Sequence, residues 1–127
     1  MILFKEEHEL AMGGPLMGKA GLLLENRVLI MLDGIFSEKV LWQTNGHYVA
    51  LAKWSLSEGR HPNQRVCIVD AQNLQIGEFE ELIFVKHFTL FKDDAIECEY
   101  YENHNIKGFV RNLKNLKFKS LRKQNEA

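Results

Sequence analysis

Hydrophobic and polar residues alternate along this chain in short runs of about four to eight residues, a spacing typical of β-strands. The clearest case is LWQTNGHYVALAKWS, residues 41–55, where Asn45-Gly46 separates two stretches rich in aromatic and β-branched residues. Asn-Gly between such stretches predicts a hairpin, because both central positions of a type I′ turn need a positive φ. We therefore expect residues 40–44 and 47–55 to pair antiparallel. The second strand is apolar on both faces near the turn, which places it in the centre of its sheet.

The rest of the chain repeats this pattern of short strands separated by turn residues. Strands are expected at residues 21–25, 27–32, 65–70, 81–91 and 95–102, with weaker candidates at 106–110 and 116–121. Lys92-Asp93-Asp94 is a turn signal that joins two of these strands into a second hairpin, in which one face is polar and acidic. Helical periodicity is poor, and the two helical candidates, residues 5–12 and 110–116, are too short to carry a fold.

These patterns predict an all-β fold, an antiparallel β-sandwich or meander with little helix. The 127 residues, of which 46% are hydrophobic and 26% charged, fit one globular domain. We divide it into an N-terminal segment with a glycine-rich connection (1–19), a β core (20–121) and a tail (122–127). The hydrophobic core is expected to include large side chains from several predicted strands: Trp42, Tyr48, Val66, Ile68, Phe84 and Phe88.

The two cysteines, Cys67 and Cys98, have no neighbours spaced for a metal site, and each lies inside an apolar or alternating run. We interpret them as reduced thiols in the core, with a disulfide between neighbouring strands as the alternative. The first residues, MILFKEEHEL, lack the apolar stretch of a signal peptide, and the longest apolar run, residues 28–32, is far too short to cross a bilayer. We expect a cytoplasmic protein that does not enter a membrane.

Charge is distributed unevenly along the chain, although the formal net charge is only −1. Residues 70–104 hold nine acids and two bases, whereas residues 105–127 hold seven bases and one acid. Blocks of this kind are most often solvated faces that neutralise each other. The alternative is an acidic face that meets a basic partner.

The stretch GGPLMGKA, residues 13–20, resembles half of a phosphate-binding loop. The motif needs a hydroxyl residue after Lys19, to hold magnesium, and the chain has Ala20 there. Such a loop must also follow a buried strand and open a long helix, whereas HELAM precedes this one and AGLLLEN follows it. We interpret the stretch as a flexible connection and expect no nucleotide binding.

The polar side chains show no catalytic or metal-binding pattern. No two of the five histidines, His8, His47, His61, His87 and His104, have the spacing of a metal site. His87 lies in the apolar run FVKHFTLF, where we expect a buried imidazole with a hydrogen-bond partner. No serine or cysteine lies in a nucleophile-elbow motif, although the many carboxylates leave a glycosidase-like pair open. We expect neither an enzyme nor a metal or cofactor.

Basic and aromatic residues interleave from residue 107 to residue 123, as in Lys117-Phe118-Lys119. A strand of this composition can follow the phosphates of a nucleic acid. The net charge of −1 opposes this interpretation, because non-specific nucleic-acid binders usually carry a basic excess. We expect no direct binding to nucleic acid.

The hairpin LWQTNGHYVALAKWS, followed by RVCIVDAQNLQIGEF, resembles one blade of a β-propeller, in which a strand pair leads to a strand that ends in Asp and a turn. A free-standing, mostly β chain built around such a stretch is similar to immunity proteins of bacterial contact-dependent growth inhibition systems. The resemblance covers about residues 20–85. It implies a cytosolic protein that binds one cognate toxin domain one-to-one, often a nuclease, and blocks its active site. Many such inhibitors are strongly acidic overall, whereas here the basic C-terminal stretch cancels the charge.

The predicted toxin-binding surface lies on the acidic strand and its turn: Asp93, Asp94, Glu97, Glu99, Tyr101 and Glu102. Glu97, Glu99 and Tyr101 share one face of the strand, next to the carboxylates of the turn. Such a surface would steer a basic partner and anchor it through tyrosine. The alternatives are a small β-rich module that binds a ligand or nucleic acid and, less favoured, a small enzyme. A ligand carrier would show a concave apolar pocket, and an enzyme would show convergent titratable groups.

Overall fold

The computed structural model of this chain describes residues 1–9, 16–55 and 63–121 and contains eleven β-strands and one short 3₁₀ helix. The elements are β1 (Ile2–Glu9), β2 (Leu16–Leu23), β3 (Leu29–Met31), β4 (Phe36–Trp42), β5 (Tyr48–Ser55), β6 (Asn63–Asp70), β7 (Gln75–Glu78), β8 (Phe84–Lys92), β9 (Ala95–Glu102), β10 (Asn105–Asn112), η1 (Leu113–Asn115) and β11 (Phe118–Ser120). The strands form two antiparallel sheets, so the predicted all-β class is confirmed.

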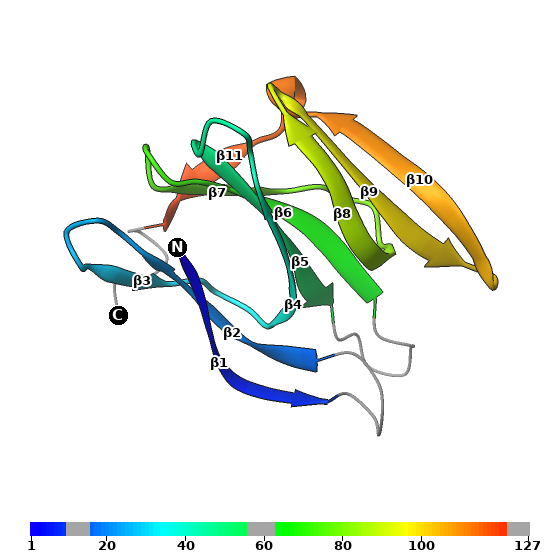
Figure 1. Ribbon diagram of the computed structural model, residues 1–127, viewed down its shortest axis with the longest axis horizontal. Helices are drawn as coiled ribbons and strands as arrows, with labels where there is room; N and C mark the ends of the chain where they lie inside the picture. Colours follow the sequence, from blue (N-terminus) through cyan, green and yellow to red (C-terminus); the bar gives the residue numbers. More distant parts are fainter. Residues whose placement is uncertain (10–15, 56–62, 122–127) are drawn as a thin grey trace.

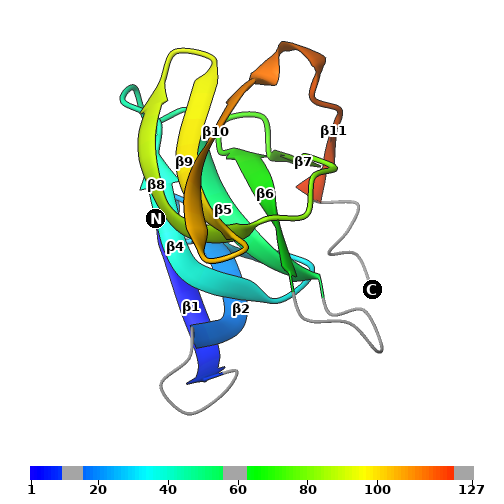
Figure 2. The same cartoon turned by 90° about the vertical axis from the view of Figure 1, so that its right-hand side faces the viewer.

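The larger sheet has eight strands in the order β1-β2-β4-β5-β6-β7-β11, with β3 paired to β2. The three-stranded sheet has the order β10-β9-β8. In Figures 1 and 2 the three-stranded sheet, in yellow and orange, packs beside the middle strands of the larger sheet, and β8 contacts β4, β5 and β6. The three-stranded sheet therefore covers one face of the larger sheet.

The middle strands β5 and β6 carry hydrophobic side chains on both faces. Ala50, Ala52, Val66 and Ile68 pack against the three-stranded sheet and form one core cluster. The opposite faces of β5 and β6 pack against β2, β3, β7 and the chain after β11, in a second cluster: Ala20, Leu22, Ile30, Leu32, Phe36, Val49, Leu51, Cys67, Val69, Ile76 and Leu121. The predicted central position of residues 47–55 is confirmed by this two-sided burial.

The first predicted hairpin forms, with β4 and β5 paired antiparallel, but its turn is not of type I′. Gln43 N–H donates to the Tyr48 carbonyl (2.8 Å) and Gly46 N–H donates to the Gln43 carbonyl (2.8 Å), which closes a loop of four residues. Gly46 has a φ of +77°, while Asn45 has no positive φ. Four-residue hairpin loops are most often built around a type I turn, so the prediction of a two-residue, type I′ Asn-Gly turn is wrong.

A two-residue turn with both φ values positive occurs instead between β9 and β10. Asn103 and His104 have φ values of +49° and +67°, and the residues that flank them, Glu102 and Asn105, are paired. Both values are those of a type I′ turn. Asparagine and histidine tolerate the left-handed region better than most side chains do, which explains this turn without glycine.

The two helical candidates of the sequence form little helix. The described part of the first candidate, residues 5–9, lies in strand β1, which is held by antiparallel pairing with β2. Residues 16–19 of the expected glycine-rich connection lie in β2. Gly13-Gly14-Pro15 lies outside the described residues. At the other end, β10 continues to Asn112, and only Leu113–Asn115 turns into a 3₁₀ helix.

The predicted core residues differ in their burial. Val66 and Ile68 are fully buried. Trp42, Tyr48 and Phe88 are only partly buried, because they lie at the margins of the two clusters. Phe84 is partly buried as well, but it is paired with Tyr101 and belongs to neither cluster, so its prediction as a core residue is wrong. Cys67 and Cys98 are buried free thiols, which confirms their interpretation. Burial raises the pKa of Cys98 to about 12 and raises that of Cys67 still more strongly, with the nearby Glu78 carboxylate as a second cause.

Candidate functional site

The predicted acidic strand, β9, is the middle strand of the three-stranded sheet. Ile96 and Cys98 point into the core and are almost fully buried. Glu97, Glu99 and Tyr101 alternate with them and therefore lie on the opposite side, which faces away from the core. We call this side the outer face of the three-stranded sheet.

The pairing register arranges the outer face in four rows that run across β8, β9 and β10. The rows are Phe84–Tyr101–Ile106, His87–Glu99–Gly108, Leu90–Glu97–Val110 and Lys92–Ala95–Asn112. The first and third rows carry large apolar side chains from β8 and β10. The second row is polar and includes a glycine, and the fourth row has a polar residue at each end.

Apolar exposure is high on this face. Leu90, Tyr101, Ile106 and Val110 are 44%, 46%, 51% and 56% exposed, and they make up four of the ten exposed large hydrophobic residues among those described. Tyr101 also makes an edge-to-face contact with Phe84, with ring centroids 5.9 Å apart. Clusters of exposed large hydrophobic side chains mark interaction sites more often than isolated ones do.

The carboxylates of the outer face are unequal in their surroundings. One Glu99 oxygen lies 3.8 Å from Lys86 Nζ, which compensates its charge in part, and 3.2 Å from His87 Nε2, within hydrogen-bond distance. Glu97 forms no ion pair among the described residues. Glu97 is therefore the carboxylate of this face whose field is least cancelled by a neighbour.

His87 is on the outer face and about half exposed, so the prediction of a buried imidazole is wrong. The reason is the pairing of β8, whose register shifts between Val85 and His87 and again between Phe88 and Leu90. Each irregularity adds a residue to one strand and resets which side chains point outward. The apolar neighbours of His87 in sequence are thus not its neighbours in space.

The six residues of the predicted binding surface do not form one patch. Asp93 and Asp94 form the turn at one end of β9, and Glu102 lies at the other end, nine residues on and about 30 Å away for an extended strand. Glu102 also faces the core side of the sheet, where it accepts a hydrogen bond from the Tyr100 hydroxyl (3.3 Å). The structure brings together Glu97, Glu99 and Tyr101 and separates Glu102 from them.

The turn carboxylates are exposed, while the turn backbone is held in place by neighbouring elements. The Gln43 amide donates to the Asp93 carbonyl, and Leu113 N–H donates to the Asp94 carbonyl (2.8 Å). Asp93 has a φ of +54°, in the left-handed region that Asp tolerates. Asp93 and Asp94 therefore present two fixed negative charges at the end of the hairpin, and the row Lys92–Ala95–Asn112 lies between them and the row of Glu97.

The apolar members of the outer face, Leu90, Ile106 and Val110, were not expected from the sequence to belong to a binding surface. Residues 106–110 were recognised only as a weak strand. The alternation of Ile106, Gly108 and Val110 with Lys107 and Phe109 is the signal that could have found them. This alternation identifies the surface only when the register between β9 and β10 is known, because the register fixes the row in which each side chain lies.

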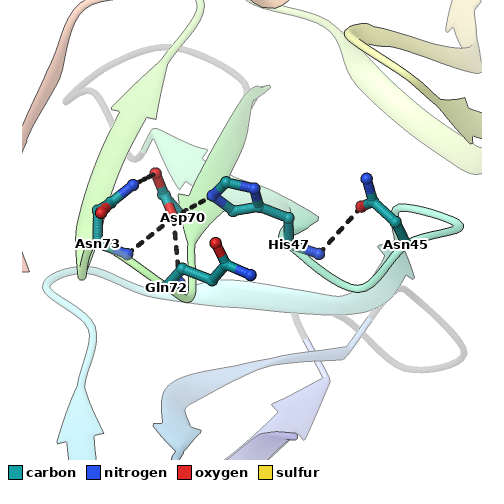
Figure 3. Close-up of polar contacts among 5 residues, drawn as sticks. All are labelled: Asn45, His47, Asp70, Gln72 and Asn73. Atoms are coloured by element: carbon teal, nitrogen blue, oxygen red, sulfur yellow. Dashed lines mark hydrogen bonds and ion pairs between the residues drawn. The ribbon is translucent and has the colours of Figure 1, made fainter.

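A second polar cluster joins the turn before β5 to the turn after β6 (Figure 3). The Asp70 carboxylate, 3% exposed, lies 2.9 Å from His47 Nε2 and accepts hydrogen bonds from Gln72 N–H (3.1 Å), Asn73 N–H (3.0 Å) and the Asn73 side-chain amide (2.9 Å). Asn45 Oδ1 accepts from His47 N–H (3.2 Å). The His47 ring stacks on Tyr48, with centroids 4.3 Å apart.

This cluster is a structural clasp and does not resemble a catalytic dyad. The carboxylate already has four hydrogen-bond contacts, three at Oδ1 and one at Oδ2, and three of them come from the turn that follows it. No Ser, Thr or Cys contacts His47, among the contacts that the described residues make. The clasp fixes two turns against each other, and we assign it no chemistry.

A hollow of about 370 Å³ lies between β5, β7 and β11. It is open to solvent and lined by groups of both signs, including Asp33, Glu78, Lys53, Lys117 and Lys119. Lys53 and Glu78 form an ion pair across part of it (3.3 Å). Ligand pockets are mostly apolar with a few polar groups, so this hollow does not have the character of one.

Neither a metal site nor a membrane-spanning helix is found in the described parts of the chain. No three His, Cys, Asp or Glu side chains come close enough to hold a metal ion, within residues 1–9, 16–55 and 63–121. In the same residues no helix is long and apolar enough to cross a bilayer. Comparison with models of known protein families finds none that matches this chain, and no curated protein sequence or solved structure matches it either.

Proposed function

We propose that this chain is a protein-binding inhibitor of the immunity type, which binds its partner through the outer face of the three-stranded sheet. The observation that carries the proposal is the exposure of Leu90, Tyr101, Ile106 and Val110 around Glu97, a carboxylate with no ion pair to any other described residue. A sheet face on which exposed apolar side chains alternate with charged ones suits a flat protein surface better than a small ligand. The sequence resemblance supplies the class of partner, a cognate toxin domain in the cytoplasm, bound one-to-one.

In this proposal the apolar and acidic groups have separate roles. The exposed aromatic and aliphatic side chains bury area on contact, and Tyr101 does so with little loss of conformational freedom, so these residues govern dissociation. Glu97, Asp93 and Asp94 attract a basic partner from a distance, so they govern association. Glu99 contributes less, because His87 and Lys86 already lie beside it.

The inhibitor would then depend less on its negative charges than the acidic strand in the sequence suggests. Glu102 lies on the other face of the sheet, and Glu99 is partly compensated, which leaves fewer free carboxylates facing the partner. The apolar rows take over that part of the binding energy. A toxin with a basic cleft bordered by hydrophobic side chains is the partner that fits this distribution.

The direct test begins with the neighbouring reading frame. If it encodes a secreted toxin, the purified toxin domain is immobilised and binding is measured by surface plasmon resonance at about 50 and 300 mM salt, which changes the screening length more than twofold. Protection of growth during co-expression is the second measurement. A toxin domain that neither binds nor is neutralised would overturn the proposed function.

Two substitutions locate the interface, each with a matched control. Tyr101→Ala should raise the dissociation rate about tenfold or more, while Val40→Ala, on the exposed side of β4, should leave it unchanged. Glu97→Lys should slow association and reduce its salt dependence, while Glu25→Lys, exposed outside both sheets, should not. If both outer-face variants bind like wild type, the toxin uses another surface.

A further inference from the structure

Strand β10 forms a free edge of the three-stranded sheet. Among the described strands it pairs only with β9, and in Figure 1 it borders the molecule, with no other strand beyond it. Its residues pair with β9 without any register shift from Asn105 to Asn112, and it contains no proline. Natural edge strands usually carry bulges, prolines or inward charges that prevent further pairing. This edge carries neither a bulge nor a proline. Its inward charges are Lys107 and Arg111, on the side of buried Phe109, and Arg111 is paired with Glu81 (2.6 Å), so pairing is possible only in a register that keeps these two cations apart.

The hydrogen bonds to β9 determine which backbone groups of β10 remain available. Leu113 N–H donates to the Asp94 carbonyl (2.8 Å) and continues the register of the β9–β10 ladder. In an antiparallel ladder hydrogen-bonded pairs alternate, so the odd-numbered residues of β10 point their N–H and C=O groups toward β9. Ile106, Gly108 and Val110 therefore point theirs toward the free edge. Consistently, the Val110 carbonyl accepts a hydrogen bond from the Arg111 side chain (2.7 Å) and not from β9.

A second copy of this chain is complementary to this edge in one register. With a two-fold axis at Gly108, the groups that point outward meet each other, Gly108 lies opposite Gly108 of the second copy, and Ile106 lies opposite its Val110. Two other positions of the two-fold axis are less favourable, because they bring like charges together. An axis at Lys107 brings two lysines together, and an axis at Phe109 places Lys107 opposite Arg111 twice.

We propose that the chain forms a symmetric dimer by antiparallel pairing of β10 with β10 of a second copy, centred on Gly108. The pairing joins the two three-stranded sheets into one sheet of six strands. At Gly108 an added Cβ would have no heavy atom within 4 Å in the single chain, so side chains can be introduced at the axis without a clash within one chain. The Arg111 side chain must share the Val110 carbonyl, which has two lone pairs, with the new ladder.

Dimerisation would also extend the outer face. The row that contains Glu97 and Val110 continues into Ile106 and Tyr101 of the second copy, so apolar side chains that are exposed in one chain become neighbours across the axis. The inference does not rest on the proposed function, because it concerns the edge of the sheet and is tested without any partner protein.

The first test is the oligomeric state of the full-length chain, measured by sedimentation equilibrium from about 1 to 200 μM. Wild type should show a concentration-dependent dimer. Gly108→Lys should weaken dimerisation by about tenfold or more, because two ammonium groups would face each other at the axis. Gly108→Thr, which adds a strand-favouring side chain without charge, should keep the dimer. Circular dichroism confirms that each variant is folded.

The second test fixes the register by cross-linking. Directly opposed residues in hydrogen-bonded pairs have Cα atoms about 5.5 Å apart, within reach of a disulfide. Gly108→Cys should therefore give a covalent dimer on mild oxidation, whereas Lys107→Cys, equally exposed, should not. A wild-type monomer at every concentration, a dimer that Gly108→Lys does not weaken, or cross-linking through Lys107→Cys would each overturn the proposal.

Discussion

The β5–β6 pair and the β9–β10 pair are both regular antiparallel ladders of eight-residue strands, yet their side chains have opposite environments. β5 and β6 are covered on both faces, so almost every apolar side chain contributes to stability. In β10 only Phe109 is buried. The same backbone pattern thus serves as the core of the fold in one place and as an exposed surface in another, and the difference lies in what packs against each face.

The sharpest test of this comparison is truncation of one apolar side chain in each pair. Ile68→Ala, in fully buried β6, should lower the free energy of unfolding by about 2–5 kcal/mol, because it leaves a cavity between the sheets. Val110→Ala, on exposed β10, should change it by less than about 0.5 kcal/mol at a concentration where the chain is monomeric. Urea denaturation measures both. Equal losses would mean that β10 is covered in the monomer.

The clasp at the end of the β5–β6 pair should show the next largest effect. Asp70→Ala removes the buried acceptor of four hydrogen bonds and should cost about 2 kcal/mol, since four part-buried donors lose their partner together. His47→Ala removes only one of those partners and should cost less. Thermal and urea unfolding of the two variants check the order. If His47→Ala costs as much as Asp70→Ala, the histidine is the main contributor.

At the other end of the clasp, Gly46→Val should destabilise the hairpin by about 1–2 kcal/mol. Gly46 has a φ of +77°, which a β-branched residue resists, and nothing lies within 4 Å of an added Cβ, so the cost comes from the backbone alone. Gly46→Asn should cost less, because asparagine tolerates the left-handed region. Identical melting midpoints for wild type and Gly46→Val would contradict this φ assignment.

The two cysteines allow the larger sheet and the three-stranded sheet to be compared by the rate of thiol labelling, and they make the free energy of unfolding depend on pH. Cys67 lies in β6 and Cys98 in β9, so thiol labelling followed by mass spectrometry should modify Cys98 first if the three-stranded sheet opens more readily.

Burial raises the pKa values of both thiols above the usual 9.0, so the thiols of the unfolded chain ionise first as the pH rises. The stability that these neutral thiols contribute is present below about pH 9 and is lost between pH 9 and about 12 for Cys98. Urea unfolding at pH 8 and 10 should show the loss, and a Cys67→Ala/Cys98→Ala variant should show less of it.

Much of the fold could be predicted from local patterns. The β4–β5 and β8–β9 hairpins, the buried strand β6 and the reduced cysteines all follow from alternation and turn residues. Strand β1 could not be predicted in this way, because its structure depends on pairing with β2 and not on its own periodicity. The turn types were also beyond local rules: Asn45-Gly46 lies in a longer loop, and Asn103-His104 forms the tight turn without glycine.

The candidate site was predictable only in part. Alternation along β9 correctly placed Glu97, Glu99 and Tyr101 on one side. Their neighbours come from β8 and β10, and the irregular pairing of β8 prevented the sequence from showing which residues face outward. The charges could be counted from the sequence, but the positions of His87 and Lys86 beside Glu99 needed coordinates.

The position of β11 has a consequence for the order in which the chain can fold during synthesis. β11 completes the larger sheet by pairing with β7, and Leu121, just after it, is fully buried in the core cluster that contains β2 and β3. The larger sheet is thus begun by the first strands and finished only after the three-stranded sheet has been translated. A nascent chain that has emerged as far as β10 still lacks this strand. We therefore expect that the edge of β7 stays open until translation passes residue 121, and that protection from proteolysis develops late.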